Sequence, residues 1–129
     1  MHFLARATIA RMIKTEHFKE KLLVEQKTLA EELGAIAIFN TETNMWEATP
    51  DQDLIGETDD NDAADRFEDF EERSAMVTTL QSRLTDINSA LLKIEEGTYG
   101  KCEVSGESIE EDRLLANPAA RTNKAHMND

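Results

Sequence analysis

Apolar residues recur every seven positions through the second half of the chain, from about residue 62 to residue 96. The two rows of this repeat are Phe70, Val77, Leu84, Leu91 and Arg73, Leu80, Ile87, Ile94. Four heptads of this kind, with one polar exception, predict a long helix with a coiled-coil seam. Asn61 or Asp62 can cap the start of this helix, and Gly97 is expected to end it.

Another helix is predicted earlier in the chain, over residues 14–34. Its apolar side consists of Phe18, Leu22, Leu29, Leu33 and Ile36. Glu25 and Glu32 interrupt the other row of this seam, and Gly34 suits the C-cap position. Neither helix can bury its apolar side alone. We therefore expect the two to fold back on each other as an antiparallel hairpin, with pairing between two chains as the alternative.

The link over residues 35–61 breaks both patterns. The run AIAIF at its start is either strand-like or the end of the preceding helix, and the remainder is rich in turn-forming residues. An irregular link of this length is usually functional or mobile. We expect Phe67 and Phe70 to meet its apolar residues, and Trp46 either to pack over the hairpin or to anchor a partner.

Negative charge is concentrated in this link and at the start of the long helix. The net charge is −13, and residues 41–72 hold 13 acidic residues against one basic residue, Arg66. Lys and Arg supply the affinity of proteins for phosphates, so we expect no direct DNA binding. The field instead favours a basic surface, a cationic channel or a metal ion. The alternative is a solvated acidic loop that serves solubility.

Length and composition limit the class of protein. The 129 residues suit one domain or one domain with a small lobe, and the high charged content of 32% suits long solvated helices. No apolar run approaches the roughly 18 residues of a membrane span, and no signal peptide is evident. The single cysteine excludes an intramolecular disulfide and suits the cytoplasm. No Ser-His-Asp, P-loop or H-E-x-x-H set occurs, so we expect no enzyme.

The C-terminal segment GTYGKCEVSGESIEEDRLLANPAARTNKAH, residues 97–126, has the frame of a small zinc finger. Cys102 and Ser105 occupy the spacing of one Cys-x-x-Cys pair, and Asn123 and His126 occupy that of the other. Structural zinc is held by four Cys, His or carboxylate ligands, and Ser and Asn are poor substitutes. These four residues are therefore a degenerate set of ligand positions. We expect no cofactor, with zinc as the alternative.

Several motifs in this half of the chain give a family resemblance. They are Gly97-Thr98-Tyr99-Gly100-x-Cys102, Gly106-Glu107-x-Ile109, Arg113-Leu114 and Ala116-Asn117-Pro118-x-Ala120-Arg121. Together with the heptad helix they resemble the DksA/TraR family of bacterial regulators that bind RNA polymerase. The resemblance implies an all-α fold. Residues 1–97 would form the long antiparallel coiled-coil hairpin and residues 98–129 a small zinc-ribbon-like lobe.

The resemblance also implies a role for the acidic link. In the family, the hairpin enters the secondary channel of RNA polymerase, and acidic residues at its tip, in the pattern Asp-x-x-Asp-x-Ala, act near the catalytic centre. One register here uses Asp62 and Asp65 and places Phe67 at the Ala position. The other uses Asp59 and Asp62 and matches all three positions. Both registers contain Asp62, and helix capping alone would also favour Asp at these sites.

If no metal is present, the lobe must be held by packing. The core expected from the sequence consists of Val104, Ile109, Leu114 and Leu115. The apolar stretch over residues 3–13 is our candidate to cover it, because an antiparallel hairpin returns the chain start to this end. Tyr99 would lie at the junction. Pro118 is expected in the first turn of a short final helix that runs through residue 126.

The function implied by the resemblance is a cytoplasmic, non-enzymatic transcription regulator that binds RNA polymerase directly. A diverged coiled-coil interaction or scaffold protein without polymerase activity is the alternative. A metal-dependent sensor that uses Cys102 and His126 is a further one. Periodicity by itself supports a helical hairpin with an acidic tip.

Overall fold

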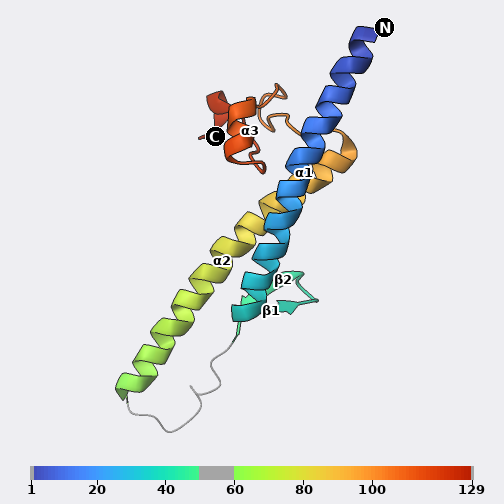
Figure 1. Cartoon of the computed structure of the whole chain (residues 1–129). Helices are drawn as coiled ribbons and strands as arrows, with labels where there is room; N and C mark the ends of the chain where they lie inside the picture. Colours follow the sequence, from blue (N-terminus) through green and yellow to red (C-terminus); the bar gives the residue numbers. More distant parts are fainter. Residues whose placement is uncertain (1, 50–59, 129) are drawn as a thin grey trace. The chain divides into compact units, whose positions relative to one another are not determined.

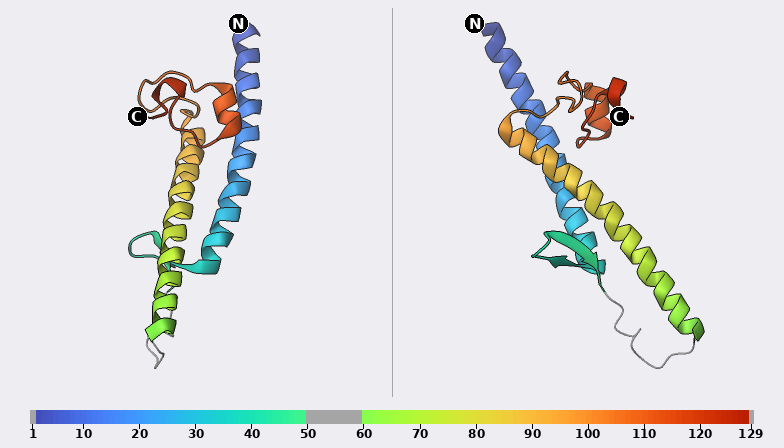
Figure 2. Two further views of the ribbon diagram at one scale, coloured as in Figure 1. Left: turned by 90° about the vertical axis from the view of Figure 1, so that its left-hand side faces the viewer. Right: turned by 180° about the vertical axis from the view of Figure 1, so that it is seen from behind.

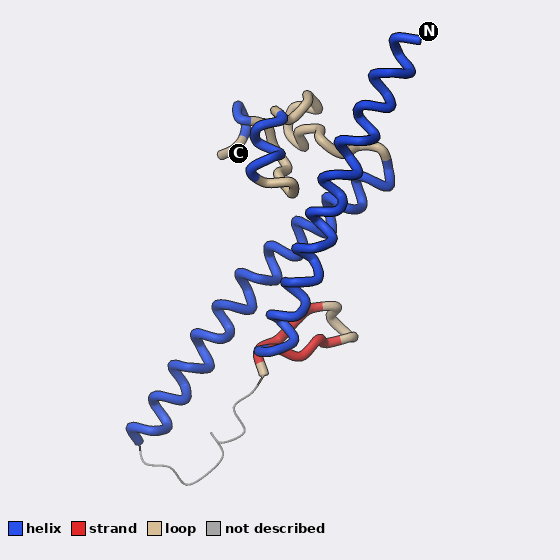
Figure 3. The backbone as a smooth tube through the Cα atoms, viewed as in Figure 1, coloured by secondary structure: helices blue, strands red, loops and turns tan. Residues whose placement is uncertain are grey.

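The computed structural model describes the backbone of residues 2–49 and 60–128, and the side chains of residues 14–49 and 62–128. The described chain is mostly helical, with one small sheet (Figure 1; Figure 3). Its elements are α1 (His2–Ile36), β1 (Ala37–Asn40), β2 (Met45–Ala48), α2 (Asp60–Glu96), α3 (Glu111–Ala116) and the 3-10 turn η2 (Lys124–His126). The expected all-α fold is therefore wrong in one respect, the two-stranded sheet. None of the described helices is long and apolar enough to span a membrane.

Helix α2 follows the predicted long helix closely, and it begins two residues earlier, at Asp60. All eight heptad positions are buried or half-buried, so the side predicted to face inward does so. Gly97 ends the helix at φ 78°, a conformation that costs glycine nothing. The N–H of Gly97 donates to the carbonyl of Ile94 and that of Thr98 to the carbonyl of Lys93, the pair of bonds that defines a Schellman cap.

Helix α1 is much longer than the predicted helix over residues 14–34. It includes the N-terminal segment and continues through Gly34, which is therefore not a cap. Gly34 does not adopt the left-handed conformation that ends a helix, and the chain stays helical to Ile36. The expected apolar side of this helix does turn inward. The predicted packing of residues 3–13 concerns side chains that lie outside the described part of the structure.

The chain divides into two compact units, and α1 and α2 contribute a segment to each. One unit comprises residues 1–27 and 85–129, and the other comprises residues 28–84. The core of the first unit is formed by Phe18, Cys102, Ile109 and Leu114, with Tyr99 and Ala120 packed against it. The core of the second unit is formed by Leu33, Ala37 and Val77, with Ile36, Trp46, Ala48, Leu80 and Leu84 packed against it.

The link expected to be irregular contains a β-hairpin. Strand β1 continues directly from the C-terminal end of α1 and turns back into β2 (Figure 2). The strands are antiparallel, and Phe39 pairs with Trp46. At the turn, the side chain of Asn40 accepts hydrogen bonds from the N–H groups of Glu42 and Thr43, and Asn44 has φ 57°. Both readings of AIAIF are thus partly right, because its first two residues are helical and the others form the strand.

Candidate functional site

The acidic start of α2 is the first candidate site. Asp62 and Asp65 lie in its first two turns with exposed side chains. Residues three apart share one side of a helix, so the two carboxylates lie close to each other. The positive end of the helix dipole stabilises negative charge here. Asp59, which the second register requires, lies outside the described residues.

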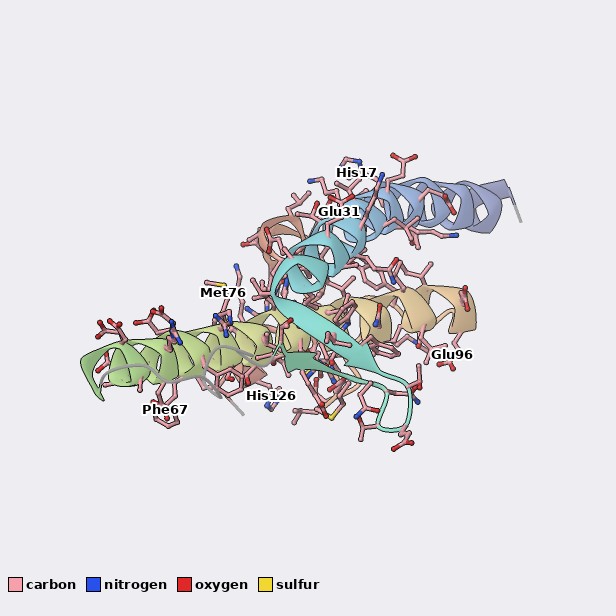
Figure 4. All side chains as sticks on the ribbon, turned by 90° about the horizontal axis from the view of Figure 1, so that it is seen from below. His17, Glu31, Phe67, Met76, Glu96 and His126 are labelled. Atoms are coloured by element: carbon pink, nitrogen blue, oxygen red, sulfur yellow. The ribbon has the colours of Figure 1, made fainter. Side chains whose placement is uncertain are left out.

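Phe67 does not pack under the link as expected. Its side chain is exposed and extends away from α2, as does that of Met76 (Figure 4). Phe70 is half-buried, and its ring centre lies 5.8 Å from the Arg73 guanidinium carbon. The β-hairpin instead packs farther along α2, where the N–H of Trp46 donates a hydrogen bond to the side-chain oxygen of Gln81. Val77, Leu80 and Leu84 therefore form the α2 side of that core.

Trp46 is half-buried in the core of its unit, as the packing interpretation predicts. Its ring meets that of Phe39 edge-on, with the ring centres 5.4 Å apart. The carbonyl of Thr49, just beyond β2, accepts a hydrogen bond of 3.3 Å from Arg73. Side chains of α2 thus hold the hairpin at two points.

The four degenerate ligand positions form the second candidate site. Cys102 and Asn123 are buried, Ser105 is exposed and His126 is half-buried. The loop after Cys102 closes as a tight turn, because the N–H of Gly106 donates to the Cys102 carbonyl over 2.9 Å. The N–H of Glu103 donates to the carbonyl of Arg121, which brings the two halves of the finger frame together. The structure therefore assembles a finger-like site from segments far apart in the sequence.

Hydrogen-bond donors converge on the sulfur of Cys102. Burial alone would raise the pKa of this thiol. The hydroxyl of Ser105 and the backbone N–H groups of Ser105, Asn123 and Val104 outweigh that effect and lower the pKa to about 7. The surroundings of the sulfur are thus suited to a thiolate. Its negative charge is stabilised by hydrogen bonds from the protein.

The side-chain amide of Asn123 connects the other positions. It is 4% exposed and is the buried polar residue among the side chains described. Its Nδ2 donates to Ser105 Oγ over 3.5 Å, and its Oδ1 accepts from the backbone N–H of His126 over 3.2 Å. The amide is therefore committed to hydrogen bonds at a place where a zinc finger needs a ligand. Cys102 is the one cysteine of the chain, and no group of three or more metal-ligating side chains occurs within the described residues. These residues do not fit zinc.

The lobe has a small core to which α1 contributes. Phe18 of α1 packs against Ile109 and Leu114, and its ring centre lies 5.8 Å from that of Tyr99. The hydroxyl of Tyr99 donates to the carbonyl of Pro118 over 2.7 Å, so Tyr99 does lie at the junction of helix and lobe. Phe18 was recognised in the sequence as part of the apolar side of its helix. Nothing in the periodicity indicated that it faces this lobe.

Two of the expected core residues, Val104 and Leu115, are exposed. The final helix expected from Pro118 through residue 126 is also wrong. Pro118 is the second residue of a turn, in which the N–H of Ala120 donates to the carbonyl of Asn117 over 3.0 Å. Helix α3 precedes this turn, and η2 is the helical element that follows it within residues 119–128. Leu114 of α3 turns inward while the adjacent Leu115 faces water, because successive residues of a helix point in different directions.

An ion-pair network joins the lobe to α2 within the same unit. Arg121 pairs with Asp86 over 2.9 Å and with Glu103 over 3.4 Å, and Lys93 pairs with Glu103 over 2.6 Å. The hydrogen bond from Lys93 is the main cause that lowers the pKa of Glu103. These groups are partly exposed, so we expect each pair to add little to the free energy of unfolding. Their main effect is to orient the lobe on the end of α2.

The chain is similar to known proteins both in its C-terminal segment and over most of its length. The model of the prokaryotic dksA/traR C4-type zinc finger matches residues 97–122. The RNA polymerase-binding transcription factor DksA of Caulobacter vibrioides is 30% identical over 109 residues, which cover 81% of this chain and 67% of that protein. General stress protein 16O of Bacillus subtilis is 33% identical over 111 residues, which cover 84% of this chain and 63% of that protein.

The fold is likewise shared with a solved structure. The transcription factor DksA2 from Pseudomonas aeruginosa superposes with a TM-score of 0.67 at 24% identity, over 88% of this chain and 80% of that one. Some relatives are much longer, and the chain spans 28% of the uncharacterized protein YteA of Bacillus subtilis at 42% identity. The finger motifs, the helical architecture and these similarities agree, and the chain belongs to the DksA/TraR family of transcription factors.

Proposed function

We propose that this protein is a cytoplasmic, non-enzymatic transcription regulator that binds RNA polymerase directly and inserts the acidic start of α2 into the secondary channel. The observation that carries the proposal is the pair of exposed carboxylates of Asp62 and Asp65 at the start of a long helix. It is supported by the relative in Caulobacter vibrioides, which is named as RNA polymerase-binding.

The chemistry of such a tip follows from its position. Carboxylates at the end of a helix stay hydrated in the free protein, so carrying them costs little. Inside a partner they can approach a bound Mg²⁺ or a basic element, both of which favour oxygen ligands of negative charge. The excess of acidic residues also makes contact with DNA phosphates unfavourable. We therefore place Asp59, Asp62 and Asp65 at the polymerase and assign no DNA contact to this chain.

The test is a binding and transcription assay with purified bacterial RNA polymerase. We expect Asp62→Asn/Asp65→Asn to retain the wild-type fold and to lose most of the effect on transcription. The matched control is Glu16→Gln/Glu20→Gln, which removes two exposed charges one turn apart on α1. A wild-type chain that does not bind polymerase would refute the proposal. An unchanged transcription effect in the tip variant would refute the role of the tip.

The two tip registers make different predictions in the same assay. If Asp62 and Asp65 form the working pair, Asp59→Asn should leave the activity nearly unchanged. If Asp59 and Asp62 form it, Asp65→Asn should be the silent change. Asp62→Asn is expected to reduce activity in both cases, because both registers contain this residue.

A specific observation favours the second candidate, a coiled-coil interaction protein that no longer acts on RNA polymerase. Phe67 is exposed where one register has the alanine of the family pattern, and its bulk changes the shape of the tip. This candidate predicts a folded chain with no affinity for polymerase. The assay above therefore separates the two functions.

We also propose that residues 98–129 work as a lobe without zinc, at the base of the segment 1–97. The hydrogen-bonded amide of Asn123 and the packing of Phe18 support this proposal. A metal-dependent sensor built on Cys102 and His126 would require further ligands, which the described side chains do not supply. Metal analysis, set out below, tests the point.

A further inference from the structure

The outer face of the β-hairpin exposes apolar side chains. In the observed register Ile38 pairs with Glu47, and Asn40 pairs with Met45. Because side chains alternate between faces along a strand, these four share the face opposite to Trp46. Ile38 is 59% exposed and Met45 is 52% exposed, and the two lie diagonally across the strands.

This exposure is concentrated rather than scattered. Among the described residues, eleven large apolar side chains remain exposed, and three of them lie on the eight strand residues of the β-hairpin: Ile38 and Met45 on the outer face, and Phe39 on the face of Trp46. Single exposed apolar residues are normal, whereas a cluster of them marks a contact surface. On the same face Asn40 Nδ2 donates to Glu47 Oε1 over 3.2 Å, which gives the apolar pair a polar, acidic neighbour.

The hairpin is held in place, so this face is presented in a defined position. An isolated two-stranded hairpin is marginally stable in water. Here the hydrogen bond from Trp46 to Gln81 and that from Arg73 to Thr49 hold it on α2, and the Trp46 ring packs into the core. A fixed apolar face loses little conformational freedom when it binds, which favours affinity.

The charge around the outer face of the β-hairpin indicates what kind of surface can cover this face. Residues 28–49 contain four acidic residues, Glu31, Glu32, Glu42 and Glu47, and no basic residue. A second copy of the chain would bring these like charges together, which is unfavourable. An apolar surface edged with Lys and Arg is complementary to the face in both respects.

We propose that the outer face of the hairpin, with Ile38 and Met45 at its centre, docks on an apolar, basic-edged patch of RNA polymerase. The identity of the partner rests on the proposed function. Along α2, Arg73 and Gln81 lie 11 and 19 residues after Asp62, which corresponds to about 16 and 28 Å at 1.5 Å per residue. The hairpin thus meets the helix well behind its acidic start. It contacts the polymerase where the channel opens, while the tip lies inside.

The test measures the affinity of purified polymerase for Ile38→Ser/Met45→Ser. We expect a loss of about 10-fold, the size of effect that removal of a well-packed contact of about 1.4 kcal/mol produces. Leu115→Ser/Met127→Ser is the matched control, because these side chains are 50% and 52% exposed and lie in the other unit. Trp46 is the one tryptophan of the chain, so its fluorescence reports whether the hairpin stays packed.

Ile38→Lys/Met45→Lys provides a second variant. It should weaken binding further than the serine variant, because it places positive charge against a basic edge. If wild type binds polymerase, the tip variant loses its transcription effect and both hairpin variants bind as wild type does, this inference is wrong while the proposed function stands. If wild type does not bind polymerase, both are wrong. A wild-type dimer that Ile38→Ser/Met45→Ser dissociates would also overturn the inference, because the face would then bind a second copy.

Discussion

The amide of Asn123 donates a hydrogen bond to the hydroxyl of Ser105, and this contact joins two of the four degenerate ligand positions expected from the sequence. The residues are 18 apart in the sequence, and the 3.5 Å between Nδ2 and Oγ brings together the two halves of the finger frame. The same amide accepts from the N–H of His126, the residue at the fourth position. A buried amide thus connects three of these positions by hydrogen bonds.

Metal analysis should find far less than one zinc ion per purified chain, because one thiolate and one imidazole cannot replace four ligands. A chelator should leave the melting temperature unchanged. The variant Ser105→Cys/Asn123→Cys/His126→Cys restores the C4 set and should bind about one zinc per chain. Stoichiometric zinc in the wild-type protein would show that the hydrogen-bonded arrangement is not the native one.

Removing the amide should destabilise the lobe. Asn123→Ala removes the bond to Ser105 and the cap on η2, and we expect the free energy of unfolding in urea to fall by about 1–3 kcal/mol. Asn128→Ala, at an exposed position nearby, serves as the control and should change it by less than about 0.5 kcal/mol. Equal stability of the two variants would contradict a structural role for Asn123.

Truncating Phe18 tests whether α1 completes the core of the lobe. Phe18→Ala should lower the free energy of unfolding by about 3–5 kcal/mol, since it leaves a cavity against Ile109 and Leu114. The control is His17→Ala, which changes the preceding, exposed residue of the same helix. Circular dichroism during urea unfolding measures both. A loss no greater than that of the control would mean that the lobe holds together without α1.

The thiol of Cys102 should make stability depend on pH. Its folded-state pKa of about 7 lies below that of an unfolded thiol, about 8.5, so the unfolded chain binds more protons between these values. The contribution of the thiolate is fully present above the unfolded pKa and is lost as pH falls through 7. Relative to Cys102→Ala, wild-type stability should therefore rise from pH 7 to pH 9. Ultraviolet absorbance of the thiolate gives the pKa directly, and parallel stability curves for the two chains would contradict the prediction.

Local patterns were sufficient for the longest element, α2. The heptad rows from Phe70 to Ile94 predicted the inward side of α2, because periodicity repeated over about seven turns averages out single exceptions. Gly97 was correctly placed at the end of this helix for the same local reason, its freedom to adopt positive φ. The finger motifs likewise identified the family from residues close together in the chain.

The β-hairpin and the core of the lobe could not be predicted from local patterns, because they depend on contacts made in the folded chain. Four-residue strands such as β1 and β2 are too short for alternation to distinguish them from a loop, and their formation depends on the fit of Trp46 over α2. Leu114 and Leu115 are adjacent and equally apolar, and only the orientation of α3 decides that the first is buried.

The sequence by itself determined the long helix α2 and its acidic start, the family, and the two ligand positions that carry Ser105 and Asn123, because each of these is given by neighbouring or regularly spaced residues. Tertiary structure alone decided which residues meet in the lobe. Phe18 packs against Tyr99 across 81 residues of chain, and Asn123 bonds to Ser105 across 18. A packed ring or a hydrogen bond between such distant residues exists only once folding has brought the segments together.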